Sequence, residues 1–170
     1  MPAVVLGPLT PEERRAFADE QIADYAAWLV ERGEAAYAAT ALARARAAIE
    51  PEMEHALRTG EAFWAARSAS HGTVGWLWVK PHGDGLPPNA AFLYQILVKP
   101  ALRRAGYGAA MLAALEQALA ASGKRELHLN VWDTNTAGRR LYERAGYELV
   151  RRLPAKRHLR KRLTPAATAG

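Results

Sequence analysis

Apolar residues in the first third of the chain recur at the three- and four-residue spacing of an amphipathic helix. A helix is predicted to begin at Thr10, because Thr10 and Glu13 have the pattern of a capping box and Pro11 suits the first helical position. The apolar spacing continues to Leu29, and Gly33 is typical of a residue that ends a helix. The pattern therefore predicts one helix between Thr10 and Gly33.

An alanine-rich segment follows and predicts a second helix over about residues 35–49. Proline has no backbone N–H, and its ring clashes with the preceding helical turn. We therefore expect Pro51 to break this helix and to open a short third helix that ends near Gly60.

The rest of the chain alternates short strand-like runs with two helical segments. The strand-like runs are 61–69, 73–80, 91–98, 125–132, 147–153 and 156–163. Helical spacing returns over 107–122 and 135–145, and the segment 80–90, rich in proline and glycine, predicts a surface loop. This order predicts an α+β fold with a mixed sheet and helices on both sides of it.

Composition narrows the class of protein. None of the 170 residues is cysteine, which excludes a disulfide scaffold, a thiolate metal site and a cysteine nucleophile. No apolar run approaches the ~18 residues of a spanning helix, and the first residues lack the basic-then-apolar order of a signal peptide. We expect a soluble, cytoplasmic protein with no metal site and no membrane partner.

The formal net charge of +6 first suggests a nucleic-acid partner. Seven of the 23 Lys and Arg residues, however, lie within residues 151–170, which contain no acidic residue. The first 150 residues carry 16 basic and 17 acidic groups and are close to neutral. The basic segment has no interleaved aromatic residues, and a terminal strand with a charged outer face explains it more simply. No nucleic-acid partner is therefore expected.

The segment from Val98 to Gly108 leads from a buried strand directly into a helix. Backbone N–H groups at a helix start are unpaired and lie at the positive end of the helix dipole, which suits phosphate. Gly106 and Gly108 remove Cβ atoms that would block close approach, and Arg103 and Arg104 add positive charge. The simpler alternative is a strand–helix turn with surface arginines. The glycine spacing does not match a dinucleotide-binding motif or a P-loop.

A second strand–helix junction follows at residues 129–135. If the two strands are parallel, both helices begin at the same edge of the sheet. Asn135 would then stand at this edge, with Tyr142 about two helical turns further along. Taken alone, Asn135 is a helix cap and Tyr142 a half-buried packing residue.

Together the two junctions resemble the GNAT superfamily of acyl-CoA-dependent N-acetyltransferases. The resemblance rests on two motifs: Arg103-x-x-Gly106-x-Gly108, and Asn135 with Leu141-Tyr142-x-x-x-Gly146-Tyr147. It covers about residues 91–150. It implies a mixed, mainly antiparallel central sheet flanked by helices, with a V-shaped splay between the central strands 91–98 and 125–132. Acyl-CoA would lie in the gap.

The resemblance also implies a role for each part of these motifs. Acetyl-CoA would be the acyl donor, and the backbone of Leu97 and Val98 would pair with its pantetheine arm. Asn135 would hydrogen-bond the same arm, and Tyr142 would protonate the leaving thiolate as general acid. The pyrophosphate would be held by the loop and the first helical turn: Arg103, Arg104, Ala105, Gly106, Tyr107, Gly108 and Ala109.

The general base is left open by the resemblance. Many relatives have Asp or Glu on the central strand, but the matching residue here is Gln95, which stands beside Tyr94. These two side chains can at most orient a water molecule. Glu61, His82 and His128 are the other candidates. The alternation of the strand around His128 favours a structural role for it, and His82 lies in the predicted surface loop.

Two positions depart from the family's pattern. Arg104 stands where many relatives have glycine, and Gly138 stands where they often have alanine. A glycine in a helix interior costs ~1 kcal/mol relative to alanine. Arg139 and Arg140, which follow Gly138, are candidates for binding the 3′-phosphate of the nucleotide.

The leading hypothesis is an N-acetyltransferase that transfers an acetyl group from acetyl-CoA to a primary amine of a small molecule or peptide by direct attack. The glutamine at position 95 motivates the alternative, a non-catalytic acyl-CoA-binding or sensing module. We expect one N-acetyltransferase domain over 1–163, with a variable helical acceptor region at 1–60, the sheet and acyl-CoA-binding core at 61–163, and a frayed tail at 164–170. The last strands leave a sheet edge that a homodimer would cover.

Overall fold

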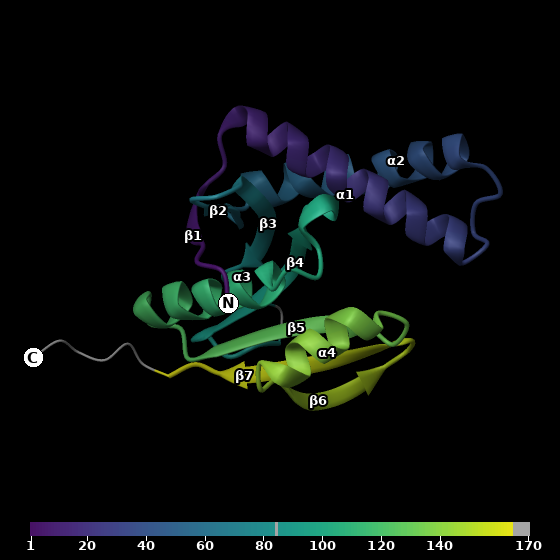
Figure 1. The fold of residues 1–170 in the computed structure, drawn as a ribbon. Coiled ribbons are helices and arrows are strands. Elements are labelled where there is room, and N and C mark those ends of the chain that lie inside the picture. Colours follow the sequence, from purple (N-terminus) through teal and green to yellow (C-terminus); the bar gives the residue numbers. More distant parts are fainter. Residues whose placement is uncertain (84, 165–170) are drawn as a thin grey trace, which may run out of the picture. The chain divides into compact units, whose positions relative to one another are not determined.

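The computed structural model describes residues 1–83 and 85–164, and the chain divides into two compact units (Figure 1). The helical unit comprises Pro8–Glu61, and the sheet unit comprises Met1–Gly7 together with the chain from Ala62 onward. Of the predicted tail, residues 165–170 lie outside the described residues.

The helical unit consists of α1 (Pro11–Glu31) and α2 (Ala38–Arg58), which pack against each other. The predicted capping box is formed, with the Glu13 N–H donating to Thr10 Oγ1 at 3.1 Å and the Thr10 N–H donating to Glu13 Oε2 at 2.9 Å. The predicted break at Pro51 is wrong, because α2 continues through this proline as one helix. Buried residues continue on both sides of it: Ala41, Ala45, Ile49, Met53 and Ala56. Burying that continuous face offsets the ~3 kcal/mol that an internal proline costs.

The sheet unit contains a seven-stranded sheet in the order β1-β2-β3-β4-β5-β7-β6. Its strands are β1 (Val5–Pro8), β2 (Ala62–Ser68), β3 (Gly72–Lys80), β4 (Ala90–Val98), β5 (Glu126–Trp132), β6 (Glu148–Leu153) and β7 (Lys156–Arg162). The pairs β2–β3, β3–β4, β5–β7 and β6–β7 are antiparallel, and β4–β5 is parallel. The predicted mixed, mainly antiparallel sheet is confirmed. The pattern did not predict β1, whose few residues carry too little alternation to stand out.

Two helices, α3 (Tyr107–Ala121) and α4 (Thr136–Arg144), pack on one face of the sheet (Figure 1). The apolar side chains of this face are buried in one cluster, which includes Leu112, Leu115 and Leu119 from α3 with Leu127, Leu129 and Val131 from β5. The opposite face carries aromatic side chains. Trp76 and Trp78 are both buried there, and the Trp78 ring packs 4.9 Å from Phe63 and 4.3 Å from Tyr94, centroid to centroid.

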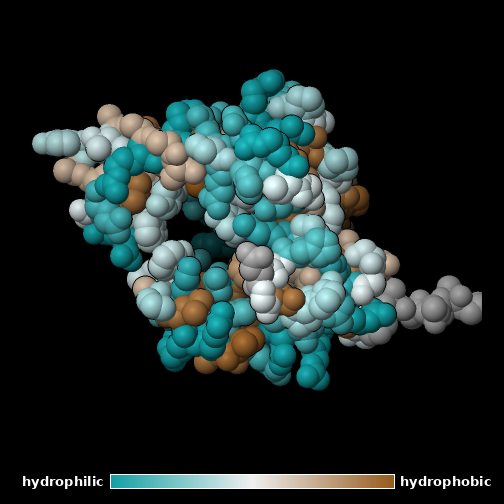
Figure 2. Space-filling model, turned by 180° about the vertical axis from the view of Figure 1, so that it is seen from behind, coloured by the Kyte–Doolittle hydropathy of each residue, from teal (hydrophilic) through white to brown (hydrophobic). Residues whose placement is uncertain are grey.

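Among the described residues, none of the helices combines the length and the apolar character needed to cross a lipid bilayer. The face of the molecule seen in Figure 2 is mainly hydrophilic, with small hydrophobic areas between the polar residues. Two of the large exposed apolar side chains, Leu149 and Val150, lie on β6, the last strand of the sheet. Arg151 and Arg152 follow them on the same strand and are exposed, as expected for an edge that is protected by charge.

Candidate active site

The two parallel strands at the centre of the sheet diverge. β4 and β5 are paired from Ala90 with Glu126 up to Leu93 with Leu129, and no further. β4 remains paired with β3 as far as Val98. The predicted splay between the central strands is therefore present, and it opens toward the carboxyl ends of both.

A β-bulge marks the point where the two strands separate. The register between β3 and β4 shifts between Trp78 and Val79, so that Tyr94 is the extra residue between Leu93 and Gln95. A bulge bends its strand and increases the local twist. It thereby turns the rest of β4, from Gln95 to Val98, away from β5.

The loop after β4 contains two left-handed backbone positions. Gly106 has φ +85°, and Arg104 has φ +66°. The family often has glycine at position 104, and the backbone explains why, since a residue other than glycine is strained in this region. Arg104 therefore differs from the family's glycine in its side chain, while its backbone has the left-handed conformation that favours glycine.

The start of α3 has a row of unused backbone donors. The N–H of Arg103 donates to Pro100 O at 3.3 Å, and the N–H of Ala110 donates to Gly106 O at 3.1 Å. Between them, the N–H groups of residues 104–109 donate to no acceptor among the described residues, and Gly106 supplies no side-chain cap. Six consecutive donors at the positive end of a helix form a cradle for an anion.

Three elements meet at this helix start. A Cβ atom on Gly108 would lie 3.4 Å from Leu141 Cδ2 and 3.8 Å from Val98 Cγ2. The end of β4, the first turn of α3 and the middle of α4 are therefore in contact. The guanidinium Nε–H of Arg103 donates to Val98 O at 3.2 Å, which ties the loop to the end of β4.

Asn135 is the N-cap of α4. Its Oδ1 accepts from the Gly138 N–H at 2.8 Å. A Cβ atom on Gly138 would lie 2.6 Å from Asn135 Nδ2. The second departure from the family's pattern is explained in this way, because the glycine makes room for the capping side chain. Asn135 Nδ2 is not used in this cap.

Tyr142 lies on the buried side of α4 with 7% of its surface exposed. Its ring meets the Tyr147 ring edge to face, with 5.6 Å between centroids. Its hydroxyl forms no hydrogen bond within residues 1–83 and 85–164. Burial raises the pKa of Tyr142 to about 12. The phenol is therefore protonated at neutral pH and has a proton to donate.

The side chains considered as general base lie in different surroundings. His82 is exposed in the loop after β3. Tyr94 and Gln95 are half-buried at the bulge, and the Lys80 Nζ lies 4.5 Å from the centre of the Tyr94 ring. Glu61 belongs to the helical unit. No Asp or Glu occurs on β4.

His128 is buried and both of its ring nitrogens are occupied. Nε2 lies 2.8 Å from Glu126 Oε2, and Nδ1 lies 2.9 Å from His158 Nε2. Burial, followed by the nearby His128 and two arginines, lowers the pKa of His158. One choice of tautomers satisfies His158, His128 and Glu126 together. In it, His158 Nε2–H donates to His128 Nδ1, and His128 Nε2–H donates to Glu126 Oε2. This network fits the structural role expected of His128, and the sequence pattern gave no sign of its two partners.

Comparison with known proteins identifies the class of protein that this fold and cleft define. The sequence pattern of the Acetyltransferase (GNAT) family matches residues 14–147. The chain belongs to this family, whose members use acetyl-CoA.

Individual relatives agree with the family match. An N-acetyltransferase of uncharacterised function from Bacillus subtilis (strain 168), YycN, is 35% identical over 85 residues. This alignment covers 50% of the chain and 54% of YycN, so that the chain spans about half the length of the curated relative it matches. In three dimensions, the YycN crystal structure has a TM-score of 0.75 at 28% identity over 89% of this chain and 96% of that one.

A second solved structure shares the fold. The PaiA N-acetyltransferase of Thermoplasma acidophilum, solved in complex with coenzyme A, has a TM-score of 0.69 at 17% identity. The comparison covers 94% of this chain and 99% of that one. The predicted GNAT fold is confirmed.

Proposed function

We propose that this protein is an N-acetyltransferase that transfers the acetyl group of acetyl-CoA to a primary amine of a small molecule or peptide. The observation that carries the proposal is the convergence of three features at one sheet edge. These are the gap between β4 and β5, the row of N–H groups at residues 104–109, and helix α4, whose Leu141 lies against Gly108 and is followed by Tyr142.

Acetyl-CoA fits the residues of this edge as a substrate. The pyrophosphate suits the six free N–H groups, because it supplies the acceptors that they lack. The exposed side chains of Arg103 and Arg104 add positive charge beside them. The pantetheine arm would run along Leu97 and Val98, the part of β4 that has no partner in β5, and Asn135 Nδ2 would donate to it.

The reaction is a direct attack. The amine nitrogen forms a bond to the thioester carbonyl carbon, the C–S bond breaks, and the sulfur leaves with the electron pair. Tyr142 donates its phenolic proton to that sulfur as general acid. The protein's other contribution is to hold both reactants in the gap between β4 and β5, which replaces a bimolecular encounter by a positioned one.

The ammonium form of the acceptor must lose a proton before attack. We assign this step to a water molecule held by Tyr94 and Gln95 at the bulge, since Gln95 does not titrate and His128 has both nitrogens occupied. The proton then passes to solvent. Loss of activity in Gln95→Ala with retention of acetyl-CoA binding would support this assignment.

Gln95 also favours a second candidate function, a non-catalytic acyl-CoA-binding or sensing module. Both functions predict that acetyl-CoA stabilises the protein against heat, and the absence of a thermal shift at saturating acetyl-CoA would contradict both. Release of free CoA thiol in the presence of a panel of polyamines, amino sugars and peptide N-termini separates them. The enzyme releases thiol with at least one of these amines, and a sensing module releases none.

A further inference from the structure

A second pocket lies between α4 and the β6–β7 hairpin. It has a volume of about 240 Å³ and is lined by Arg139, Glu143, Tyr147, Leu149, Arg157 and Leu159. Arg139 and Leu141 are two residues apart on a helix and point to nearly opposite sides. Leu141 faces Gly108 in the cleft, so that the pocket lies on the other side of α4. The expectation that Arg139 binds the nucleotide therefore lacks geometric support.

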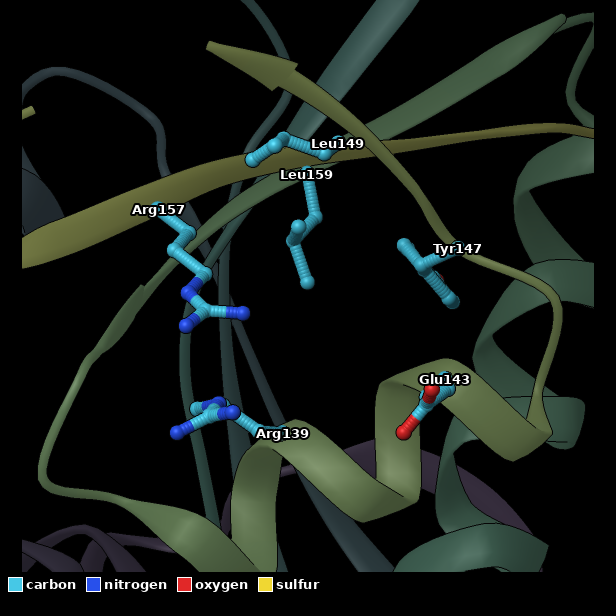
Figure 3. Close-up of a pocket in the computed structure, with 6 residues that line it drawn as sticks. All are labelled: Arg139, Glu143, Tyr147, Leu149, Arg157 and Leu159. Atoms are coloured by element: carbon cyan, nitrogen blue, oxygen red, sulfur yellow. The ribbon is translucent and has the colours of Figure 1, made fainter. Parts of the chain in front are cut away.

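The polar groups of the pocket are separated by sign. Figure 3 shows the Arg139 and Arg157 side chains together on one side, with Glu143 on the other side along α4 and the two leucines above them. Asp133 holds the arginines in place: the Arg157 Nε–H donates to its Oδ1 at 2.8 Å, and an Arg139 Nη1–H donates to its carbonyl oxygen at 3.1 Å.

Both ends of the pocket have unused polar groups. The Nε of Arg139 is buried and has no hydrogen-bond partner among the described residues. A buried guanidinium N–H without an acceptor is unfavourable, and native proteins rarely leave one unpaired. The carboxylate of Glu143 forms no ion pair within the described part of the chain, although Arg139 lies one helical turn away. Because Nε is closed to solvent, a ligand in the pocket would meet Arg139 at its terminal Nη groups and would meet Glu143 at its unpaired carboxylate.

The charges and the volume of the pocket limit the kinds of ligand that it can hold. The two guanidinium groups are balanced by Asp133 and Glu143, so the pocket suits a ligand without net charge better than a phosphate ester. Its volume of about 240 Å³ suits a small ligand. Leu149 and Leu159 offer apolar surface between the charged ends.

We propose that this pocket binds a free α-amino acid with an apolar side chain. Its carboxylate would accept from Arg139 and Arg157, and its ammonium group would donate to Glu143. The side chain would pack on Leu149 and Leu159. The pocket adjoins Tyr142 through the ring of Tyr147, and its occupation does not depend on the transferase activity.

The test is isothermal titration of the full chain, without acetyl-CoA, with three probes of one shape. L-leucine carries both charges, 4-methylpentanoate lacks the ammonium group, and 3-methylbutylamine lacks the carboxylate. We expect L-leucine to bind and each analogue to bind at least about tenfold more weakly, because each leaves one charged group of the pocket unpaired. Binding of L-leucine should persist at saturating CoA.

Two variants separate a loss of ligand binding from a loss of folded protein. Glu143→Gln should weaken L-leucine about tenfold and leave 4-methylpentanoate unchanged, whereas Arg139→Gln should weaken both. Arg144→Gln, an exposed arginine on the same helix outside the pocket, is the matched control and should change neither. The proposal is overturned if L-leucine gives no heat at millimolar concentration, if the three probes bind equally, if CoA displaces L-leucine, or if Arg144→Gln weakens it as much as Arg139→Gln.

Discussion

The β4–α3 and β5–α4 junctions both lead from a parallel strand into a helix at the same edge of the sheet. They differ in whether a side chain caps the first N–H groups of the helix. The β5–α4 junction caps itself, since Asn135 Oδ1 accepts from the Gly138 N–H. The β4–α3 junction has Gly106 at the N-cap and leaves residues 104–109 without acceptors.

The difference separates two tasks that a strand–helix junction can perform. A self-capped helix is locally complete and serves as a rigid support, in this case for Tyr142. An uncapped helix leaves its first N–H groups to water, and a ligand with strong acceptors can take the place of that water. The proposed function assigns catalysis to the self-capped helix α4 and phosphate binding to the uncapped helix α3.

Removing the hydroxyl carried by the self-capped helix should have the largest effect. We expect Tyr142→Phe to lower kcat by roughly 10²–10⁴-fold, the usual contribution of a general acid, with little change in KM for acetyl-CoA. The melting temperature should change little, since the hydroxyl has no hydrogen-bond partner to lose. An unchanged kcat would remove Tyr142 from the mechanism.

Adding a cap to the open junction should have the next largest effect. Gly106→Asp places a carboxylate over the free N–H groups and should weaken acetyl-CoA binding by about 100-fold, through competition for the donors and through charge repulsion. Gly106→Asn competes without the charge and should weaken it by about tenfold. The dissociation constants are measured by titration.

Gly123 offers a matched control for the strain of these substitutions. It has φ +92°, close to the φ +85° of Gly106, so it matches the backbone strain. A Cβ atom on Gly123 would meet nothing within 4 Å, whereas one on Gly106 would lie 3.1 Å from Pro2 Cδ. Gly123→Asp and Gly123→Asn should lower stability modestly and leave acetyl-CoA affinity unchanged. Equal losses of affinity at both glycines would show that strain, and not the cap, is responsible.

The proton on Tyr142 gives a prediction for pH. Because burial raises the folded-state pKa to about 12 from an ordinary value of 10.0, the folded protein holds this proton more tightly than the unfolded chain. The free energy of unfolding should therefore be independent of this group below pH 10 and should fall as the pH rises from 10 toward 12. Chemical denaturation at several pH values measures it. Tyr142→Phe should make the alkaline fall shallower without abolishing it, because burial and the nearby Glu116 raise the pKa of Tyr147 as well.

The cap itself can be tested by a double-mutant cycle. Asn135→Ala should cost about 1 kcal/mol by loss of the N-cap. Gly138→Ala should be nearly neutral in the native chain, because ~1 kcal/mol of helix propensity is offset by displacement of the Asn135 side chain. In the Asn135→Ala background the same change should stabilise by about 1 kcal/mol. Additive effects would mean that the two positions are not coupled.

Relief of strain at the open junction should give the smallest effect. Arg104→Gly removes the cost of φ +66° for a residue with a Cβ atom, against the larger entropy that glycine loses on folding. We expect a net gain of roughly 0.5 kcal/mol, measured as a rise in the denaturation midpoint. A loss of stability would show that the Arg104 side chain makes a stabilising contact.

Local sequence signals predicted most elements and the parts of the site that depend on neighbours in the chain. Capping residues, glycines and apolar spacing act within a few residues, so the helix start at Thr10, the order of most elements along the chain and the motif around Gly106 could all be predicted from them. Pro51 is the exception. Proline locally favours the end of a helix, but here the burial of one continuous helix face outweighs this preference, and burial depends on the tertiary structure.

By itself, then, the sequence determined the fold class, the family and the position of the glycine-containing helix start at Gly106, because each of these is encoded in residues close together in the chain. Tertiary structure alone decided where β4 leaves β5, since this depends on a bulge in the register with β3. It also decided that Arg139 and Arg157 share a pocket with Glu143, because β7 brings a residue of the basic C-terminal segment beside α4. Pairing of distant strands is set by burial and register over the whole sheet, and no local pattern contains that information.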